Sequence, residues 1–283
     1  MVISASRRTD IPCYYSKWFM ERIRAGYVMT KNPMNPAQIR RVSLDPKDTQ
    51  CIVFWTKDAK NIMPDLKELD DIGHKYYFQF TVTPYDNTYE RNLRPKKDIE
   101  RSFIELSDMI GREKVIWRYD PIIINDYMMV DEHKKQFEQM AKLFEKHIDT
   151  VTVSFVDMYK RISSPLIREA SENERAELSR FIADCAKAHG MKAVSCCENG
   201  LSQYGIGQAH CIDAKLIERI AGRKLDLLPD KNQRKGCGCA ESVDIGAYDT
   251  CLNGCIYCYA CHGDHVQKKN AARHDPHGEF LLA

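Results

Sequence analysis

Short apolar runs alternate with amphipathic segments along most of the chain. Six of the runs are rich in β-branched and aromatic residues, and several are almost continuously apolar: 2–6, 51–55, 75–83, 114–120, 150–157 and 192–198. Such runs are typical of parallel strands that are covered on both faces. The pattern therefore predicts six buried strands.

The segments between these runs have helical periodicity and recognisable ends. Apolar residues recur every three or four positions in 96–111 and in 132–148. Three further helices are expected between a cap-type residue and a glycine, namely Ser16 to Gly26, Ser171 to Gly190 and Asp213 to Gly222. Six strand–helix units in succession predict a parallel sheet with right-handed crossovers.

Polar clusters follow the six predicted strands and bear on how the sheet closes. They are Arg7 to Asp10; Thr56, Lys57 and Asp58; Thr83, Tyr85 and Asp86; Arg118, Tyr119 and Asp120; Asp157, Tyr159 and Lys160; and Cys196, Cys197 and Glu198. A flat doubly wound sheet is one solution. The clusters favour a partial (β/α)6 TIM-like barrel, since such barrels hold their active sites at the carboxyl ends of the strands.

The last part of the chain has a different composition. Residues 223–283 are poor in apolar residues and rich in cysteine. We expect residues 1–222 to form the barrel, and the Cys-rich extension 223–283 to pack on it rather than fold alone. The formal net charge of +2 leaves no polyanion footprint. The polar N-terminus and the lack of an apolar run of about 18 residues predict a cytoplasmic protein without a membrane segment.

Cysteine usage points to metal chemistry. Of twelve cysteines, only Cys13, Cys51 and Cys185 are scattered, and the other nine fall between 196 and 261. The cytosol keeps thiols reduced, so clustered cysteines there more often ligate metal than form disulfides. Cys251, Cys255 and Cys258 read C-x3-C-x2-C. A structural zinc would need a fourth ligand, such as Cys261 or His262, whereas a [4Fe–4S] cluster on three thiolates keeps one iron open.

The C-x3-C-x-aromatic-C pattern, with Tyr257 before the last cysteine, resembles the motif of the radical S-adenosylmethionine (SAM) superfamily. The resemblance implies a [4Fe–4S] cluster on Cys251, Cys255 and Cys258, with the SAM amine and carboxylate on the open iron. It also implies a partial (β/α)6 barrel, a one-electron donor such as flavodoxin or ferredoxin, and hydrogen abstraction by a 5′-deoxyadenosyl radical. In that superfamily the cysteines normally follow the first strand, so we expect the extension to fold back over the barrel mouth.

The resemblance extends over essentially the whole chain. The start SASRRTDIP and the end pattern DIGAYDTCxxGCxYCYA resemble the domain of unknown function 1848 family, whose members stand near spore photoproduct lyase-like proteins. This closer resemblance implies no established substrate. It leaves nucleic acid as a candidate partner, although the small basic spots of the chain do not form a nucleic-acid groove by composition.

Four further cysteines are enough for an auxiliary cluster or a zinc site: Cys197, Cys211, Cys237 and Cys239. Cys196 and Cys197 end a predicted strand, so their side chains should point to opposite faces, and the sequence does not decide which one is a ligand. The alternative is that these thiols are buried small hydrophobic side chains. Cys261 is a weak candidate for a catalytic thiol.

Four charged residues at the strand ends are candidates for SAM contacts. Arg8 and Arg118 could pair with a carboxylate, Lys57 follows the strand that receives the amine in the resembling superfamily, and Asp120 could hold a ribose hydroxyl. The alternative for each is a salt bridge between loops.

Two functions of different classes remain. The first is a radical SAM enzyme acting on an unknown substrate. The second is a non-catalytic binding protein stapled by zinc or iron–sulfur, one that could contact nucleic acid.

Overall fold

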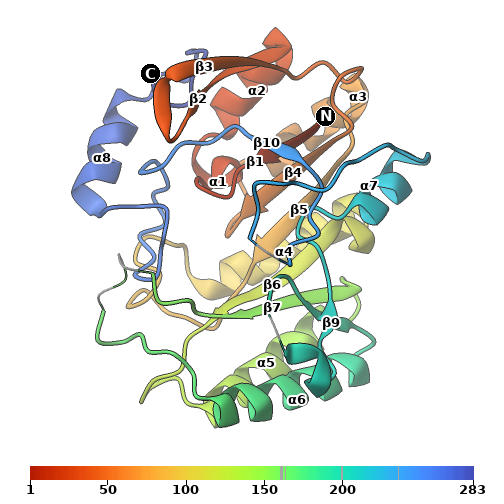
Figure 1. Ribbon diagram of the computed structural model, residues 1–283, viewed down its shortest axis with the longest axis vertical. Coiled ribbons are helices and arrows are strands. Elements are labelled where there is room, and N and C mark those ends of the chain that lie inside the picture. Colours follow the sequence, from red (N-terminus) through yellow and green to blue (C-terminus); the bar gives the residue numbers. More distant parts are fainter. Residues whose placement is uncertain (160–161, 163, 199, 235) are drawn as a thin grey trace.

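One parallel sheet organises the chain. The computed structural model describes residues 1–283 except 160–161, 163, 199 and 235, so Lys160 of the fifth polar cluster lies outside the described residues. Eight strands form the sheet in the order β10-β1-β4-β5-β6-β7-β8-β9 (Figure 1), and all their pairings are parallel.

The six predicted strands all form and lie side by side in chain order. They are β1 (Val2–Ala5), β4 (Cys51–Thr56), β5 (Tyr76–Thr81), β6 (Val115–Ile122), β7 (Thr150–Phe155) and β8 (Lys192–Ser195). The predicted parallel α/β sheet is therefore confirmed. Its curvature into a partial barrel stays a prediction, because the strand order alone is also compatible with an open twisted sheet.

The five predicted helices are also present: α2 (Ser16–Ala25), α4 (Lys96–Ile110), α5 (Val130–Phe144), α6 (Glu172–Ala188) and α7 (Ala214–Ala221). Ser171 caps α6 in a capping box with Glu174, and the side chain of Asp213 caps α7. Helices α5 and α6 lie side by side along the lower part of Figure 1.

Several elements were not expected from the sequence. Helices α1 (Ile11–Tyr14), α3 (Leu66–Ile72) and α8 (Asp264–Arg273) and three short 3-10 turns (Met63–Asp65, Arg112–Lys114 and Leu201–Tyr204) complete the helical part. Strands β2 (Tyr27–Asn32) and β3 (Asn35–Ser43) form an antiparallel hairpin apart from the main sheet. Strands β9 (Gly207–Gln208) and β10 (Ser242–Asp244) extend the main sheet at its two ends.

Aromatic side chains fill the space between the sheet and its helices. Phe54 of β4 stacks on Phe78 of β5 with ring centroids 4.7 Å apart. The ring of Trp117 in β6 stacks on Phe137 of α5 at 5.1 Å. Phe80 meets Phe103 of α4 edge-on at 5.2 Å. These contacts bury large apolar surfaces and fix the two helices on one face of the sheet.

The extension folds back onto the start of the chain. Strand β10 pairs in parallel with β1, so that Val2 lies opposite Ser242 and Ser4 opposite Asp244 (Figure 1). The carboxylate of Asp244 accepts hydrogen bonds from Ser4 Oγ at 3.1 Å and from the backbone N–H of Arg7 at 2.9 Å. It also forms an ion pair with Arg8 at 3.1 Å. The residues that follow β10 are thereby brought to the carboxyl end of the sheet.

Among the described residues, no helix combines the length and the apolar composition that crossing a membrane requires.

Replacing Asp244 by alanine should loosen this fold-back. The change removes the acceptor of several hydrogen bonds and the partner of Arg8, so we expect the free energy of unfolding to fall by about 2–4 kcal/mol. Urea denaturation measures the change. Asp226→Ala, at an exposed position of the same extension, is the matched control. Equal midpoints for the two variants would contradict this account of how β10 is held.

Candidate metal centre and cofactor pocket

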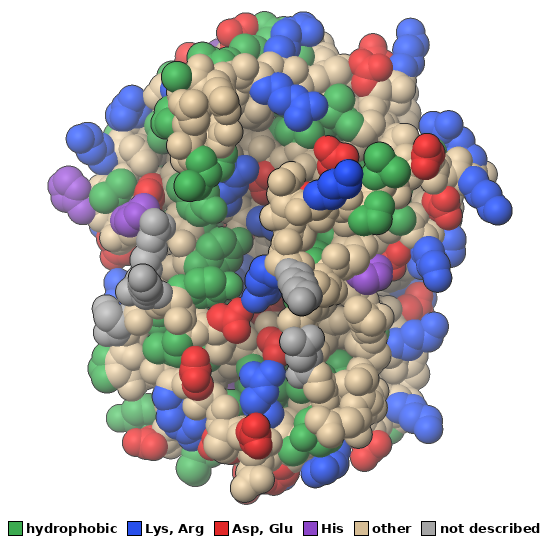
Figure 2. All heavy atoms as spheres, in the orientation of Figure 1, with side chains coloured by type: hydrophobic (Ala, Val, Ile, Leu, Met, Phe, Trp, Pro, Cys, Tyr) green, Lys and Arg blue, Asp and Glu red, His purple; other side chains and the backbone are tan. Residues whose placement is uncertain are grey.

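A cavity of about 590 Å³ opens at the carboxyl ends of the parallel strands. Residues at the ends of β1, β4, β5, β6, β7 and β8 line it, together with residues of the extension. Figure 2 shows charged side chains of both signs around the recess near the centre of this face. Parallel α/β sheets bind their ligands at this end, because loops from several strands converge there.

The C-x3-C-x2-C cysteines lie in the cysteine loop, residues 249–263, between β10 and α8. Cys251, Cys255 and Cys258 all line the cavity. Their sulfurs are not among the described groups whose ligand atoms lie within 4.8 Å of one another, so they surround a wider space than one ion fills. The structure thus brings together the three cysteines that the spacing singled out, at the place where the fold-back was expected to put them.

A buried glutamate holds the cysteine loop. Glu90 is 1% exposed, and its carboxylate accepts hydrogen bonds from Lys57 Nζ at 2.8 Å, Thr83 Oγ1 at 2.7 Å and Lys96 Nζ at 2.8 Å. The hydroxyl of Tyr257, the aromatic residue of the motif, also donates to it. Burial alone would raise the pKa of Glu90, but the two ammonium groups outweigh it and lower the pKa to about 2. The glutamate is therefore ionised and ties the loop to the sheet.

A second buried carboxylate acts in the same way. Asp10 is 5% exposed and caps α1 by accepting from the Cys13 N–H at 3.1 Å. It also accepts from Thr56 Oγ1 at 2.7 Å, from the Lys57 N–H at 2.8 Å and from Asn253 Nδ2 at 3.1 Å. Burial raises the pKa of Asp10 to about 6, against the effect of these four donors. Asn253 lies between Cys251 and Cys255, so this bond fixes the middle of the motif.

Backbone bonds complete the docking of the loop. The Ile256 N–H donates to the Tyr89 carbonyl at 3.0 Å, and Glu90 and Cys255 form an isolated antiparallel bridge. Asn92 Nδ2 donates to the Leu252 carbonyl at 2.8 Å. The connection between β5 and α4 thus holds the first half of the motif, while Asp10 and Tyr15 of the N-terminal segment bond to Asn253 and Thr250.

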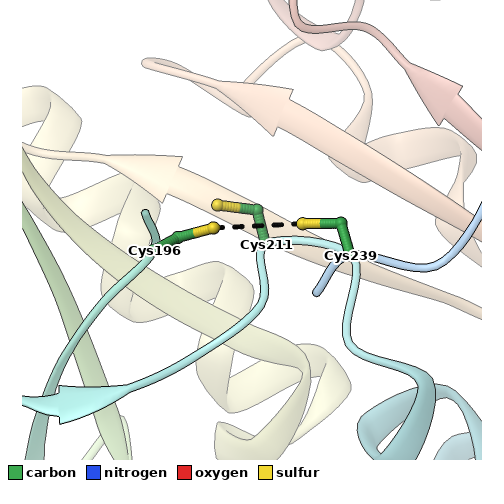
Figure 3. Close-up of side chains that lie close together, drawn as sticks. All are labelled: Cys196, Cys211 and Cys239. Atoms are coloured by element: carbon green, nitrogen blue, oxygen red, sulfur yellow. Dashed lines mark hydrogen bonds between the residues drawn. The ribbon is translucent and has the colours of Figure 1, made fainter. Parts of the chain in front are cut away.

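Five further cysteines form two overlapping groups that line the same cavity. The inner trio is Cys196, Cys211 and Cys239, and the outer trio is Cys196, Cys197 and Cys237; within each trio all sulfurs lie within 4.8 Å of one another. The sulfurs of Cys196 and Cys239 point toward each other at 3.9 Å (Figure 3). All five residues line the cavity.

The set Cys197, Cys211, Cys237 and Cys239 stays a prediction, to which the structure adds Cys196, the residue that both trios share. One expectation about these cysteines needs correction, namely that Cys196 and Cys197 point to opposite faces. Cys197 has φ of 60°, in the left-handed region, which breaks the alternation of a strand and lets both thiols line the cavity.

Within the inner trio, Cys211 is the residue that favours the thiolate form, while the pKa values of Cys196 and Cys239 are raised. Hydrogen bonds from the thiols of Cys196 and Cys239 lower the pKa of Cys211 well below its ordinary value, and the nearby guanidinium of Arg118 adds to the effect. Arg118 Nη1 lies 3.3 Å from the Cys211 sulfur. A thiolate is the form in which cysteine binds metal.

The four charged candidates all line the cavity, and all make contacts with the protein. Arg8 pairs with Asp244, and its guanidinium lies 5.3 Å from the ring centroid of Tyr248. Lys57 pairs with Glu90, and Arg118 pairs with Asp120. Arg118 also donates to Gln79 Oε1 at 3.1 Å. The structure places these side chains in one site, where their contacts orient them.

Cys261 lies beside Cys258, and its thiol lowers the pKa of Cys258 to about 7. It is buried, it is not among the residues that line the cavity, and its sulfur donates to the Cys251 carbonyl at 3.7 Å. His262 Nδ1 lies 2.6 Å from Asp249 Oδ2. Neither residue lines the cavity, but Cys261 remains the thiol next to the motif cysteines and thus the fourth ligand that a zinc site would use.

A family model described as "Domain of unknown function (DUF1848)" matches residues 2–260. The chain belongs to this family. The match covers the six predicted strands, the fold-back and eight of the nine clustered cysteines, and stops before Cys261. The chain is thus a member of the DUF1848 family, and it has groups of cysteines that could bind metal.

Other comparisons add little to the DUF1848 assignment. No curated protein sequence matches the chain. One similar solved structure is a protein from Bacteroides thetaiotaomicron provisionally titled an alpha-L-fucosidase, with 7% identity and a TM-score of 0.28 over 80% of this chain and 84% of that chain. A likeness this weak carries no argument about fold or function.

The sequence did not predict the residues that hold the cysteine loop in place through hydrogen bonds. Glu90 and Asn253 carry no local signal, because their partners lie up to 243 positions away. Asp10 was seen only as part of a polar cluster. The sequence does not decide whether Cys196 is a ligand, because no sequence pattern predicts the positive φ of Cys197.

Glu90→Gln should free the cysteine loop. The change leaves two buried ammonium groups and the Tyr257 hydroxyl without their ionised acceptor, so we expect a loss of about 3–5 kcal/mol in the free energy of unfolding. Urea denaturation measures it, and Glu105→Gln, exposed on α4, is the control. A Glu90→Gln variant as stable as Glu105→Gln would refute the role given to this carboxylate.

Proposed function

We propose that the chain is a radical SAM enzyme, in which Cys251, Cys255 and Cys258 hold a [4Fe–4S] cluster and SAM binds in the cavity. The observation that carries this proposal is the convergence of the three motif cysteines and four charged strand-end residues on one cavity. The volume of about 590 Å³ falls within the range of ordinary cofactor pockets.

The place of the cysteine loop in the sheet supports the proposal. The loop comes last in the sequence, but it follows β10, which lies at the edge of the sheet beside β1. In space the cysteines therefore follow an edge strand that precedes the six predicted strands in order. This is the position that the resemblance implies, reached by a strand from the opposite end of the chain.

The donor set suits a multi-iron cluster better than one zinc ion. Four thiolates around a tetrahedral zinc stand about 3.8 Å apart, given a Zn–S bond of about 2.3 Å. The three loop sulfurs do not all lie within 4.8 Å of one another. Cys261 lies beside Cys258 but does not line the cavity, so on the cavity side an external molecule would complete the coordination. When bound, such a cluster supplies the electron that cleaves SAM to a 5′-deoxyadenosyl radical.

The charged residues of the pocket match the polar groups of SAM. Arg8 and Arg118 bring guanidinium groups to the cavity wall, where the carboxylate of SAM would compete for them with Asp244 and Asp120, and Asp120 can also accept from a ribose hydroxyl. On the cavity wall the rings of Tyr159 and Tyr259 lie 5.6 Å apart, and both are partly exposed. They offer an apolar surface to a purine. The partner that delivers the electron is a one-electron donor such as flavodoxin or ferredoxin.

The direct test is SAM cleavage. Chain reconstituted anaerobically with iron and sulfide, then given dithionite and SAM, should release 5′-deoxyadenosine, which chromatography and mass spectrometry measure. Cys255→Ala should reduce the product to background, because the cluster loses one of three thiolates. Cys185→Ala, on α6 and away from the cavity, should leave it unchanged.

The second candidate function predicts different results. A zinc-stapled binding protein would retain zinc tightly, take up no iron at the cysteine loop and leave SAM intact. That outcome would overturn the enzymatic proposal. The 3.9 Å spacing of Cys196 and Cys239, close to that of a zinc site, is the observation that keeps this candidate open.

A further inference from the structure

We infer that Cys196, Cys197, Cys211, Cys237 and Cys239 together hold a second, polynuclear metal centre, with at least two ions and with Cys196 as the shared ligand. The inference does not depend on the proposed function, since it concerns sulfurs other than those of the cysteine loop. The two sites line the same cavity, so a molecule bound there can contact both.

The geometry of the sulfurs excludes one ion that all five cysteines bind. Each trio has its sulfurs within 4.8 Å, and the 3.9 Å between Cys196 and Cys239 matches the separation of about 3.8 Å expected on one tetrahedral ion. The five sulfurs do not form one group at that spacing, and they exceed the four corners of a tetrahedron. Two trios that meet at Cys196 instead describe two metal positions joined by a common thiolate.

The backbone is built to bring these sulfurs together. Cys196 and Cys197 follow β8, Cys211 follows β9, and Cys237 and Cys239 lie in the connection to β10. The Ala240 N–H donates to the Ile212 carbonyl at 2.9 Å and thereby holds the second and third segments together. The hydroxyl of Tyr77 donates to the Cys211 carbonyl at 2.8 Å.

Two local features of the backbone, at Cys197 and at Gly238, favour a metal site over a group of inert thiols. The left-handed φ of 60° at Cys197 costs about 1–2 kcal/mol for a residue with a Cβ, yet it turns the thiol into the cavity. Between Cys237 and Cys239, a Cβ on Gly238 would lie 2.2 Å from His210 Cε1. Glycine at this position lets the His210 ring approach the backbone between the two thiols, and any larger residue would force the ring to move.

Hydrogen-bond donors stand where thiolates bound to metal need them. Arg118 Nη1 lies 3.3 Å from the Cys211 sulfur, and the Ile212 N–H donates to the Cys239 sulfur at 3.5 Å. Such outer contacts offset the negative charge that several thiolates bring to one site. The atoms that could bind the metal are all sulfur. Sulfur ligands select thiophilic ions, namely zinc or iron with inorganic sulfide.

The test removes the loop site first. The full-length variant Cys251→Ala/Cys255→Ala/Cys258→Ala is loaded anaerobically, either with zinc or with iron and sulfide, and metal and sulfide per chain are measured. We expect at least two metal ions per chain to remain bound, and the form that loads identifies the metal. One ion or none per folded chain would overturn the inference.

A further substitution tests the shared ligand. Cys196→Ser in that background should reduce the bound metal by at least half, since both trios lose a sulfur, whereas Cys185→Ser should change nothing. Equal metal content in the Cys196→Ser and Cys185→Ser chains would also overturn the inference. Because the loop cysteines are absent here, neither result depends on whether the wild-type chain cleaves SAM.

A measurement on the wild-type chain covers the case in which the variants do not fold. Alkylation followed by mass spectrometry reports which thiols metal protects. We expect metal loading to protect all five cysteines of the two trios. Protection of four or fewer of them would contradict a centre that uses every one.

Discussion

Two buried carboxylates, those of Glu90 and Asp10, hold the cysteine loop at the cavity. An ion removed from water costs several kcal/mol unless it is paired and hydrogen-bonded. Glu90 has two ammonium groups, and Asp10 has four hydrogen-bond donors. In each case one of the donors comes from the cysteine loop, Tyr257 for Glu90 and Asn253 for Asp10. The loop is thus placed by charge and hydrogen bonds, and the three thiolates follow from that placement.

The electrostatics of the cysteine loop suit it to a metal. Burial raises the pKa of Cys251 to about 12 and that of Cys255 well above its ordinary value, whereas a hydrogen bond with the Cys261 thiol lowers the pKa of Cys258 to about 7. Cys258 is thus the thiol that ionises most readily, and a bound metal would supply the charge that lets the other two ionise. The second group of cysteines differs, since Arg118 already stands beside Cys211. One cavity thus carries two sulfur-rich walls with different charge compensation.

Local patterns were enough to predict the six strands, the five helices and the motif cysteines, because hydrophobic periodicity and ligand spacing are written within short stretches. Elements without such a pattern were missed. The first seven residues of β3 are exposed, and β10 has three half-buried residues, so neither shows strand alternation. The contact of Tyr257 with Glu90 joins residues 167 positions apart and has no local signature. Ideal strand geometry predicts that Cys196 and Cys197 point to opposite faces. The positive φ of Cys197 breaks this alternation, and no local pattern in the sequence predicts it.

The central claim is that the docked cysteine loop holds iron at the cavity. X-ray diffraction from crystals of anaerobically reconstituted chain, recorded on both sides of the iron absorption edge, tests it most directly. The account predicts iron density bonded to the sulfurs of Cys251, Cys255 and Cys258, on the side that faces the cavity. Zinc at these sulfurs, or three sulfurs without metal in a chain that carries iron elsewhere, would contradict it.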